Sequence, residues 1–192
     1  MVMSHQTTRT MLRCPLLANE WRRFGRSPVA HWRGRMLLNQ DFRDLFVELN
    51  AHGVEFLVVG AHALAVHGYV RATKDLDVWV RPSPENAPRV MAALRSFGAA
   101  THAVAQADFE VPGITFQIGV EPVRIDIITE IDGVIFEPAW RNRIAVEYGG
   151  VPVFAISRDD LIRNKLTSGR PQDLVDVESL ERHKTEPPPN SR

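Results

Sequence analysis

Helical and strand-forming patterns alternate along the chain from residue 36 to residue 182. Phe42, Leu45, Phe46 and Leu49 recur at the spacing of one helix face, and short apolar runs bounded by glycine, proline or charge indicate strands. This order predicts an α/β or α+β domain, with a mixed sheet flanked by helices and with C-terminal helices, rather than a doubly wound sheet. Helices are expected from Phe42 to Gly53, over 61–67, from Ser83 to Gly98, after Ser157 and from Pro171 to Leu180; strands are expected over 55–59, 76–80, 114–120 and 123–129, with a hairpin or single strand over 145–156.

Residues 1–35 differ in composition from the rest of the chain. Seven of the 23 lysines and arginines lie there, against the single acidic residue Glu20, and no helix or strand period is sustained. The segment is interpreted either as a basic arm that contacts RNA or a membrane, or as a disordered or extraneous extension upstream of a working start at Met36, which we favour. The expected domain covers 36–182, and the proline-rich segment 183–192 is expected to be a disordered tail.

Charge and cysteine content limit the function classes. The formal net charge is zero, so no overall basic field indicates nucleic-acid binding. The single cysteine, Cys14, excludes an internal disulfide and a Cys-rich zinc site, as is typical of proteins in a reducing cytosol. No apolar run approaches the roughly 20 residues that a membrane span needs. We therefore expect a soluble cytoplasmic protein without a membrane partner.

Two aspartates lie in the strand-forming segment Lys74–Val80. The two-residue period of a strand places Asp75 and Asp77 on one face, while Leu76 and Val78 point into the core. Two such carboxylates repel each other, and a divalent cation between them offsets the repulsion. The segment therefore predicts half of a metal site.

A third carboxylate, Asp126, lies among the apolar residues of a later strand-forming segment, 123–129. An aspartate within an apolar strand is unfavourable unless something satisfies it. If this strand lies beside the first, the three carboxylates form an oxygen site suited to Mg²⁺, which prefers carboxylates together with substrate phosphates.

The Asp-x-Asp pattern also occurs on the solvated face of an edge strand, where each charge simply faces water. The preceding segment favours the metal site. A buried strand ends at Gly60 just where a helix begins at Ala61, and such a turn presents backbone N–H groups to phosphate oxygens. A tight turn alone would explain this glycine equally well. The order of the turn and the three aspartates is what indicates function.

Residues 40–180 resemble the nucleotidyltransferase superfamily, the polymerase-beta-like fold, and in particular its small toxin-type members from abortive-infection toxin–antitoxin systems. The superfamily pattern is a Gly-Ser or Gly-Gly turn, a helix, an arginine, Asp-x-Asp and a later aspartate on an adjoining strand. The toxin-type members add a lysine segment and an Asp-x-x-Asp element, which we expect to orient Lys165 or Arg170. The matching residues here are Gly60, Ala61, Arg71, Asp75, Asp77, Asp126, Lys165, Asp173 and Asp176.

The resemblance implies a metal-dependent nucleotidyltransferase that moves an NMP from an NTP such as ATP to a hydroxyl acceptor, either an RNA end or a protein. It implies Asp75, Asp77 and Asp126 as catalytic residues that hold two Mg²⁺ ions, with Mn²⁺ as the alternative. It also implies an antitoxin as partner of a toxin-type protein. The implied nucleotide-binding residues are Gly60, Ala61, Arg71 and Lys165.

Two other hypotheses stay open. Ala61 keeps the backbone N–H of the superfamily turn but lacks its hydroxyl, which favours a catalytically inactive nucleotide- or partner-binding module of the same fold. A different metal-dependent phosphoryl enzyme, such as a hydrolase, would need a general base that the sequence does not reveal. The sequence does not indicate which NTP, which acceptor or which oligomeric state applies.

Overall fold

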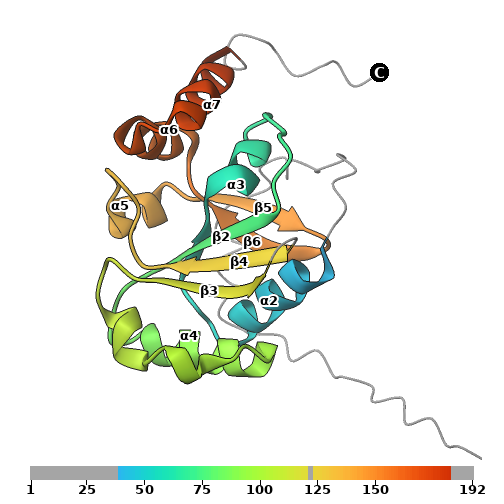
Figure 1. Cartoon of the computed structure of the whole chain (residues 1–192), viewed down its shortest axis with the longest axis vertical. Helices are drawn as coiled ribbons and strands as arrows, with labels where there is room; N and C mark the ends of the chain where they lie inside the picture. Colours follow the sequence, from blue (N-terminus) through green and yellow to red (C-terminus); the bar gives the residue numbers. More distant parts are fainter. Residues whose placement is uncertain (1–38, 121–122, 183–192) are drawn as a thin grey trace, which may run out of the picture.

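The computed structural model describes residues 39–120 and 123–182, which form a mixed sheet with helices on both faces (Figure 1). This architecture confirms the predicted fold class. The two end segments singled out above, 1–35 and 183–192, lie outside the described residues. The elements in chain order are α2 (Gln40–Ala51), β1 (Phe56–Val58), α3 (Gly60–Val66), β2 (Asp75–Val80), α4 (Ala87–Phe97), the 3₁₀ helices η1 (Thr101–Ala103) and η2 (Gln106–Glu110), β3 (Thr115–Val120), β4 (Val123–Ile128), α5 (Phe136–Arg141), β5 (Ile144–Tyr148), β6 (Val151–Ala155), α6 (Arg158–Ser168) and α7 (Pro171–Arg182).

The sheet of the described region has the strand order β3-β4-β2-β1-β6-β5. β2 is antiparallel to β1 and parallel to β4, and β1 is parallel to β6. The edge strands β3 and β5 are each antiparallel to their inner neighbour. β5 and β6 form the hairpin expected over 145–156, and its turn residues Gly149 and Gly150 have φ of 55° and 81°, which glycine adopts without strain. The two strands that carry the three aspartates are therefore inner neighbours.

A separate hydrophobic core covers each face of the sheet. On one face α2 and α4 pack on Leu76, Val78 and the other strand residues of the same parity. On the other face α3, α5 and residues of α6 and α7 pack around Trp79, whose ring meets Phe136 edge-on with centroids 5.0 Å apart. Figure 1 shows α3, α6 and α7 on this second side and α4 on the opposite one. Asp75 and Asp77 share the parity of Trp79, so they belong to the α3 side.

The expected helix start at Ser83 and Pro84 is wrong, because α4 begins at Ala87. The Ser83 side chain opens a turn instead, accepting a hydrogen bond from Asn86 N at 3.2 Å. The buried Asn86 side chain then accepts a hydrogen bond from Glu55 N and donates to the carbonyl oxygens of Glu55 and Arg81. These three bonds hold the chain at the start of β1 and the end of β2 and delay the helix by one turn.

Three short elements, α5, η1 and η2, have no periodicity that predicts them. Two of them are held by tertiary contacts: Phe136 of α5 is buried and its ring meets that of Trp79 in β2, and Phe109 of η2 is fully buried in the core. Helices this short are not stable by themselves in water, so their positions depend on these anchors. None of the described helices combines the length and apolar character that crossing a membrane requires.

Candidate active site

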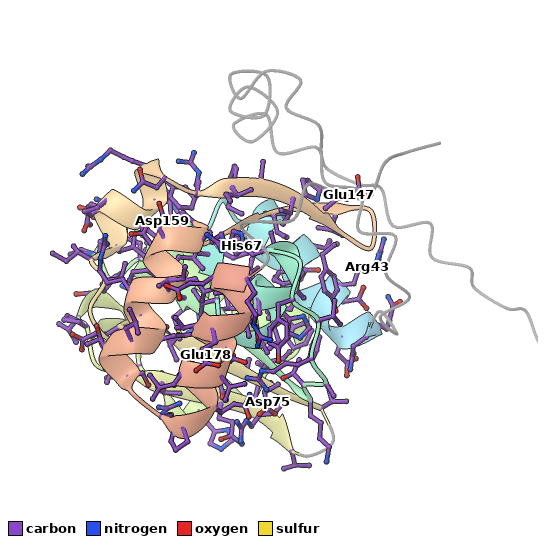
Figure 2. The ribbon with its side chains drawn as sticks, turned by 90° about the horizontal axis from the view of Figure 1, so that it is seen from above. Arg43, His67, Asp75, Glu147, Asp159 and Glu178 are labelled. Atoms are coloured by element: carbon purple, nitrogen blue, oxygen red, sulfur yellow. The ribbon has the colours of Figure 1, made fainter. Side chains whose placement is uncertain are left out.

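β2 and β4 bring Asp75, Asp77 and Asp126 onto one face of the sheet, and we call these residues the acidic trio. In the parallel register of the two strands, Asp77 lies directly opposite Asp126, and Asp75 lies opposite Arg124. Leu76, between the first two aspartates, is fully buried on the other face. Figure 2, which looks onto α6 and α7, shows Asp75 outside the outline of these helices. The arrangement of neighbouring strands that the metal-site hypothesis required is therefore present.

Gly60 lies against the carboxylate of Asp77. A Cβ atom at residue 60 would stand 1.9 Å from Asp77 Oδ2 and 2.8 Å from its Cγ, and Gly60 also has a positive φ of 61°. The turn is fixed to β2 because Val59 N donates a hydrogen bond to Asp77 O at 3.1 Å. Only glycine satisfies both the close approach and the backbone conformation. The turn that the sequence predicted is thus in direct contact with the acidic trio.

Burial and mutual repulsion change the acidity of the trio. Burial, followed by the charges of Asp126 and Asp75, raises the pKa of Asp77 from 3.8 to about 6, against the opposing effect of Arg124 and Lys165. Burial also raises the pKa of Asp126, where the positive charge of Arg124 is the largest opposing effect. Keeping these carboxylates ionised side by side costs free energy, and a cation in their midst lowers that cost.

Arg124 is the site residue that the sequence did not single out. Its Nη2 donates a hydrogen bond to Asp75 Oδ2 at 2.7 Å, and its Nε lies 3.3 Å from Asp126 Oδ2. An arginine in a strand is usually a solvated surface residue, and this one is still 32% exposed. The available signal was its position two residues before Asp126, which places both side chains on one face.

A second charged cluster lies where α6 meets α7. Lys165 Nζ donates to Asp173 Oδ1 and to Asp176 Oδ2, each at 2.8 Å, and Arg71 Nε lies 3.3 Å from Asp176 Oδ1. Lys165 and Asp176 are buried, with 4% and 0% of their surfaces exposed. The expectation that the Asp-x-x-Asp pair orients Lys165 is confirmed. The two cations proposed for nucleotide binding, Arg71 and Lys165, share one acidic partner, and Lys165 is close enough to affect the pKa of Asp77.

Replacing Lys165 with methionine is expected to lower the free energy of unfolding by about 3–5 kcal/mol, because it leaves Asp176 buried without its closest cation. Urea denaturation followed by circular dichroism measures the change. In the double variant Lys165→Met/Asp176→Asn much of the loss should be recovered, since the uncompensated charge is gone. A single variant that stays within about 1 kcal/mol of the parent would contradict the burial of this pair.

The donor set of the acidic trio suits a hard divalent ion. All its donors are carboxylate oxygens, and within the described residues Asp126 Oδ1 is a buried atom without a hydrogen-bond partner. The missing side chain at Gly60 leaves Asp77 Oδ2 uncrowded from that side. As the side chains stand, however, no three Asp, Glu, His or Cys residues of the described ranges are arranged so that they could hold a metal ion. Two of the three carboxylates contact Arg124 instead.

Comparison with known proteins decides the family. The family model described as "Nucleotidyltransferase of unknown function (DUF6036)" matches residues 37–184. The chain belongs to this nucleotidyltransferase family. Its fold is similar to the crystal structure of a Thermotoga maritima protein provisionally assigned as a nucleotidyltransferase, with a TM-score of 0.50 and 16% identity over 76% of this chain and 91% of that one.

Two further solved structures are similar to this nucleotidyltransferase-family protein. One is the antibiotic-resistance factor ANT(2'')-Ia in solution, with a TM-score of 0.49 and 15% identity over 76% of this chain and 81% of that one. The other is an antigenic nucleotidyltransferase-like protein from Paracoccidioides brasiliensis, with a TM-score of 0.44 and 15% identity over 73% and 74% of the two chains. No curated protein matches the chain.

Proposed function

We propose that this nucleotidyltransferase-family protein moves an NMP from an NTP, such as ATP, onto a hydroxyl group of an RNA end or a protein, and that it requires divalent metal. The observation that carries the proposal is the direct pairing of Asp77 with Asp126 across β2 and β4, beside a glycine whose missing side chain makes room for the Asp77 carboxylate. Like charges buried side by side lower the free energy of unfolding, and a catalytic role explains why the protein has them.

Asp75, Asp77 and Asp126 are the residues that would hold the metal, as two Mg²⁺ ions or as Mn²⁺. Bound there, the ions would neutralise the triphosphate and lower the pKa of the attacking hydroxyl. Support comes from the oxygen-only donor set, from the unpartnered Asp126 Oδ1 and from the raised pKa of Asp77. Release of Arg124 from Asp75 and Asp126 is a condition for this role.

The chain's own groups supply positioning and proton transfer. The acceptor hydroxyl oxygen attacks the α-phosphorus, the bond to the leaving pyrophosphate breaks, and the hydroxyl proton passes to Asp126, a carboxylate whose pKa is raised by burial. Backbone N–H groups at Gly60 and Ala61 meet phosphate oxygens. Arg71 and Lys165 stabilise negative charge on the phosphates, with Asp176 holding both side chains in place.

The second candidate is a catalytically inactive module of the same fold that binds a nucleotide or a protein partner. Two observations favour it: Ala61 lacks a hydroxyl group, and Arg124 already supplies Asp75 and Asp126 with a cation. A toxin–antitoxin complex could use either form, with an antitoxin as the protein partner. The single Cys14 suits a cytoplasmic location for both.

Incubation of the full chain with each α-phosphate-labelled NTP, Mg²⁺ and total cellular RNA or protein tests the proposal. We expect label on one acceptor class, release of pyrophosphate and complete loss of both with EDTA. Tight NTP binding without transfer would support the inactive module. Release of inorganic phosphate or nucleoside monophosphate, without labelled acceptor, would support a hydrolase instead.

A further inference from the structure

Arg124 contacts two carboxylates of the acidic trio, those of Asp75 and Asp126. It lies on β4 directly opposite Asp75, and it shares a strand face with Asp126 two residues later. One guanidinium therefore contacts an oxygen of Asp75 at 2.7 Å and an oxygen of Asp126 at 3.3 Å. No ion pair of this kind involves Asp77 within the described residues.

A divalent ion held by Asp75 Oδ2 or Asp126 Oδ2 would need the oxygen atoms that Arg124 contacts. A guanidinium donates hydrogen bonds to carboxylates at about 2.7–2.9 Å, whereas Mg²⁺ binds oxygen at about 2.0–2.1 Å, so the two cations cannot occupy one place. The guanidinium is not enclosed by the protein, because the Arg124 side chain is 32% exposed, so it can turn out into water. Binding of an ion is then an exchange of cations rather than a simple addition.

We infer that Arg124 is a built-in counter-cation of the acidic trio, which competes with divalent ions for Asp75 and Asp126. It acts as a positioning residue that keeps the metal-free site neutralised and weakens binding of free divalent ions. A triphosphate offers the displaced guanidinium another anion, so ions and nucleotide enter together. The inference rests on the proposed function for its biological meaning, but the competition itself is measurable without any transfer reaction.

The chain supplies a closely matched control in Arg81. This residue follows the last residue of β2, at the opposite end of the strand from Asp75, and it too bridges two carboxylates: Nη1 lies 2.8 Å from Glu55 Oε2 and Nε lies 3.3 Å from Glu137 Oε1. Its side chain is 37% exposed, close to the value for Arg124. Arg81→Gln removes the same charge and the same pattern of contacts away from the acidic trio.

Binding of Mn²⁺ alone to the full chain, followed by the electron paramagnetic resonance signal of free Mn²⁺, tests the inference. We expect Arg124→Gln to bind Mn²⁺ at least about tenfold more tightly than the parent, because a unit charge a few ångströms away is removed. Arg81→Gln should bind like the parent. Equal or weaker binding by Arg124→Gln would overturn the inference, and so would an equal gain in Arg81→Gln.

Arg124→Lys provides a second variant in case Arg124→Gln does not fold, which circular dichroism will show. Lysine keeps the charge but cannot span two carboxylates with a planar fork, so its Mn²⁺ affinity should fall between those of the parent and Arg124→Gln. If Arg124→Lys binds Mn²⁺ no more tightly than the parent does, the bridging role of Arg124 is contradicted. If the parent transfers no label from any NTP, the proposed function fails while the Mn²⁺ comparison still decides the role of Arg124.

Discussion

Asp77→Asn should abolish transfer and at the same time make the metal-free protein more stable at neutral pH. Activity should fall by at least about 100-fold, since even partners that merely support metal ligands account for about 10- to 100-fold. Stability should rise because burial and like charges give Asp77 a pKa of about 6, against 3.8 ordinarily. Each pKa unit corresponds to about 1.4 kcal/mol, so a gain of about 3 kcal/mol is expected above pH 6.

The raised pKa of Asp77 determines the direction in which stability changes with pH. A proton on Asp77 favours the folded chain, so its contribution is complete below pH 3.8 and is lost as the pH rises through about 6. The difference between parent and Asp77→Asn should therefore grow from pH 4 to pH 7, as measured by urea denaturation in EDTA. Taking the difference matters, because His62, whose pKa burial lowers to about 4, titrates in the same range with the opposite sign.

Asp75→Asn is the control within the trio. Asp75 is one of the proposed metal-holding residues, so the variant should lose transfer. The Asp75 carboxylate also accepts a hydrogen bond from Arg124, so the variant should become slightly less stable. Transfer should be lost in both variants, while the free energy of unfolding changes in opposite directions at Asp75 and Asp77. This result would separate the contribution of each residue to transfer from its contribution to stability. A destabilised Asp77→Asn would contradict the repulsion on which the site description depends.

Gly60→Ala should lower the free energy of unfolding by about 3 kcal/mol. Alanine at a positive φ costs about 1–2 kcal/mol, and forcing an extra carbon into an occupied space costs about 1–3 kcal/mol more. The space is occupied by the Asp77 carboxylate, 1.9 Å from the new Cβ. Transfer should also be lost, because either Asp77 or the turn must move.

Two variants isolate these contributions. Gly68 has a φ of 92° and nothing within 4 Å of its own Cβ position, so Gly68→Ala pays the backbone cost alone. In an Asp77→Ala background the clashing oxygen and carbon are absent, and adding Gly60→Ala should then cost about as much as Gly68→Ala. If Gly60→Ala costs the same in both backgrounds, the contact between this glycine and Asp77 is not what fixes residue 60.

Residue patterns predict the face that each strand residue takes, but not the pairing of the strands. The alternation around Asp75 and Asp77 and the spacing of Asp173 and Asp176 were sufficient to place these side chains, because strand and helix periods are local properties. The adjacency of β2 and β4 came from the resemblance and not from a local signal. Local periods do not determine which distant strands meet.

Arg124 shows where this limit affects the site. Its role depends on the register between β2 and β4. A shift of that pairing by one residue would place Leu76, and not Asp75, opposite Arg124. The error at Ser83 has the same origin: the side chain of Asn86 binds backbone groups of Glu55 and Arg81, and no pattern within the helix itself reports those contacts. Tertiary hydrogen bonds decided both cases.

The parallel pairing of β2 and β4 has a consequence for how the molecule is made. Parallel neighbours need a long connection, and Asp75 and Arg124 are 49 positions apart in the chain. As the chain leaves the ribosome, Asp75 and Asp77 emerge well before Asp126 and Arg124. The repulsive third carboxylate and the arginine that offsets it thus arrive on the same strand, so the nascent sheet never has to accommodate one without the other.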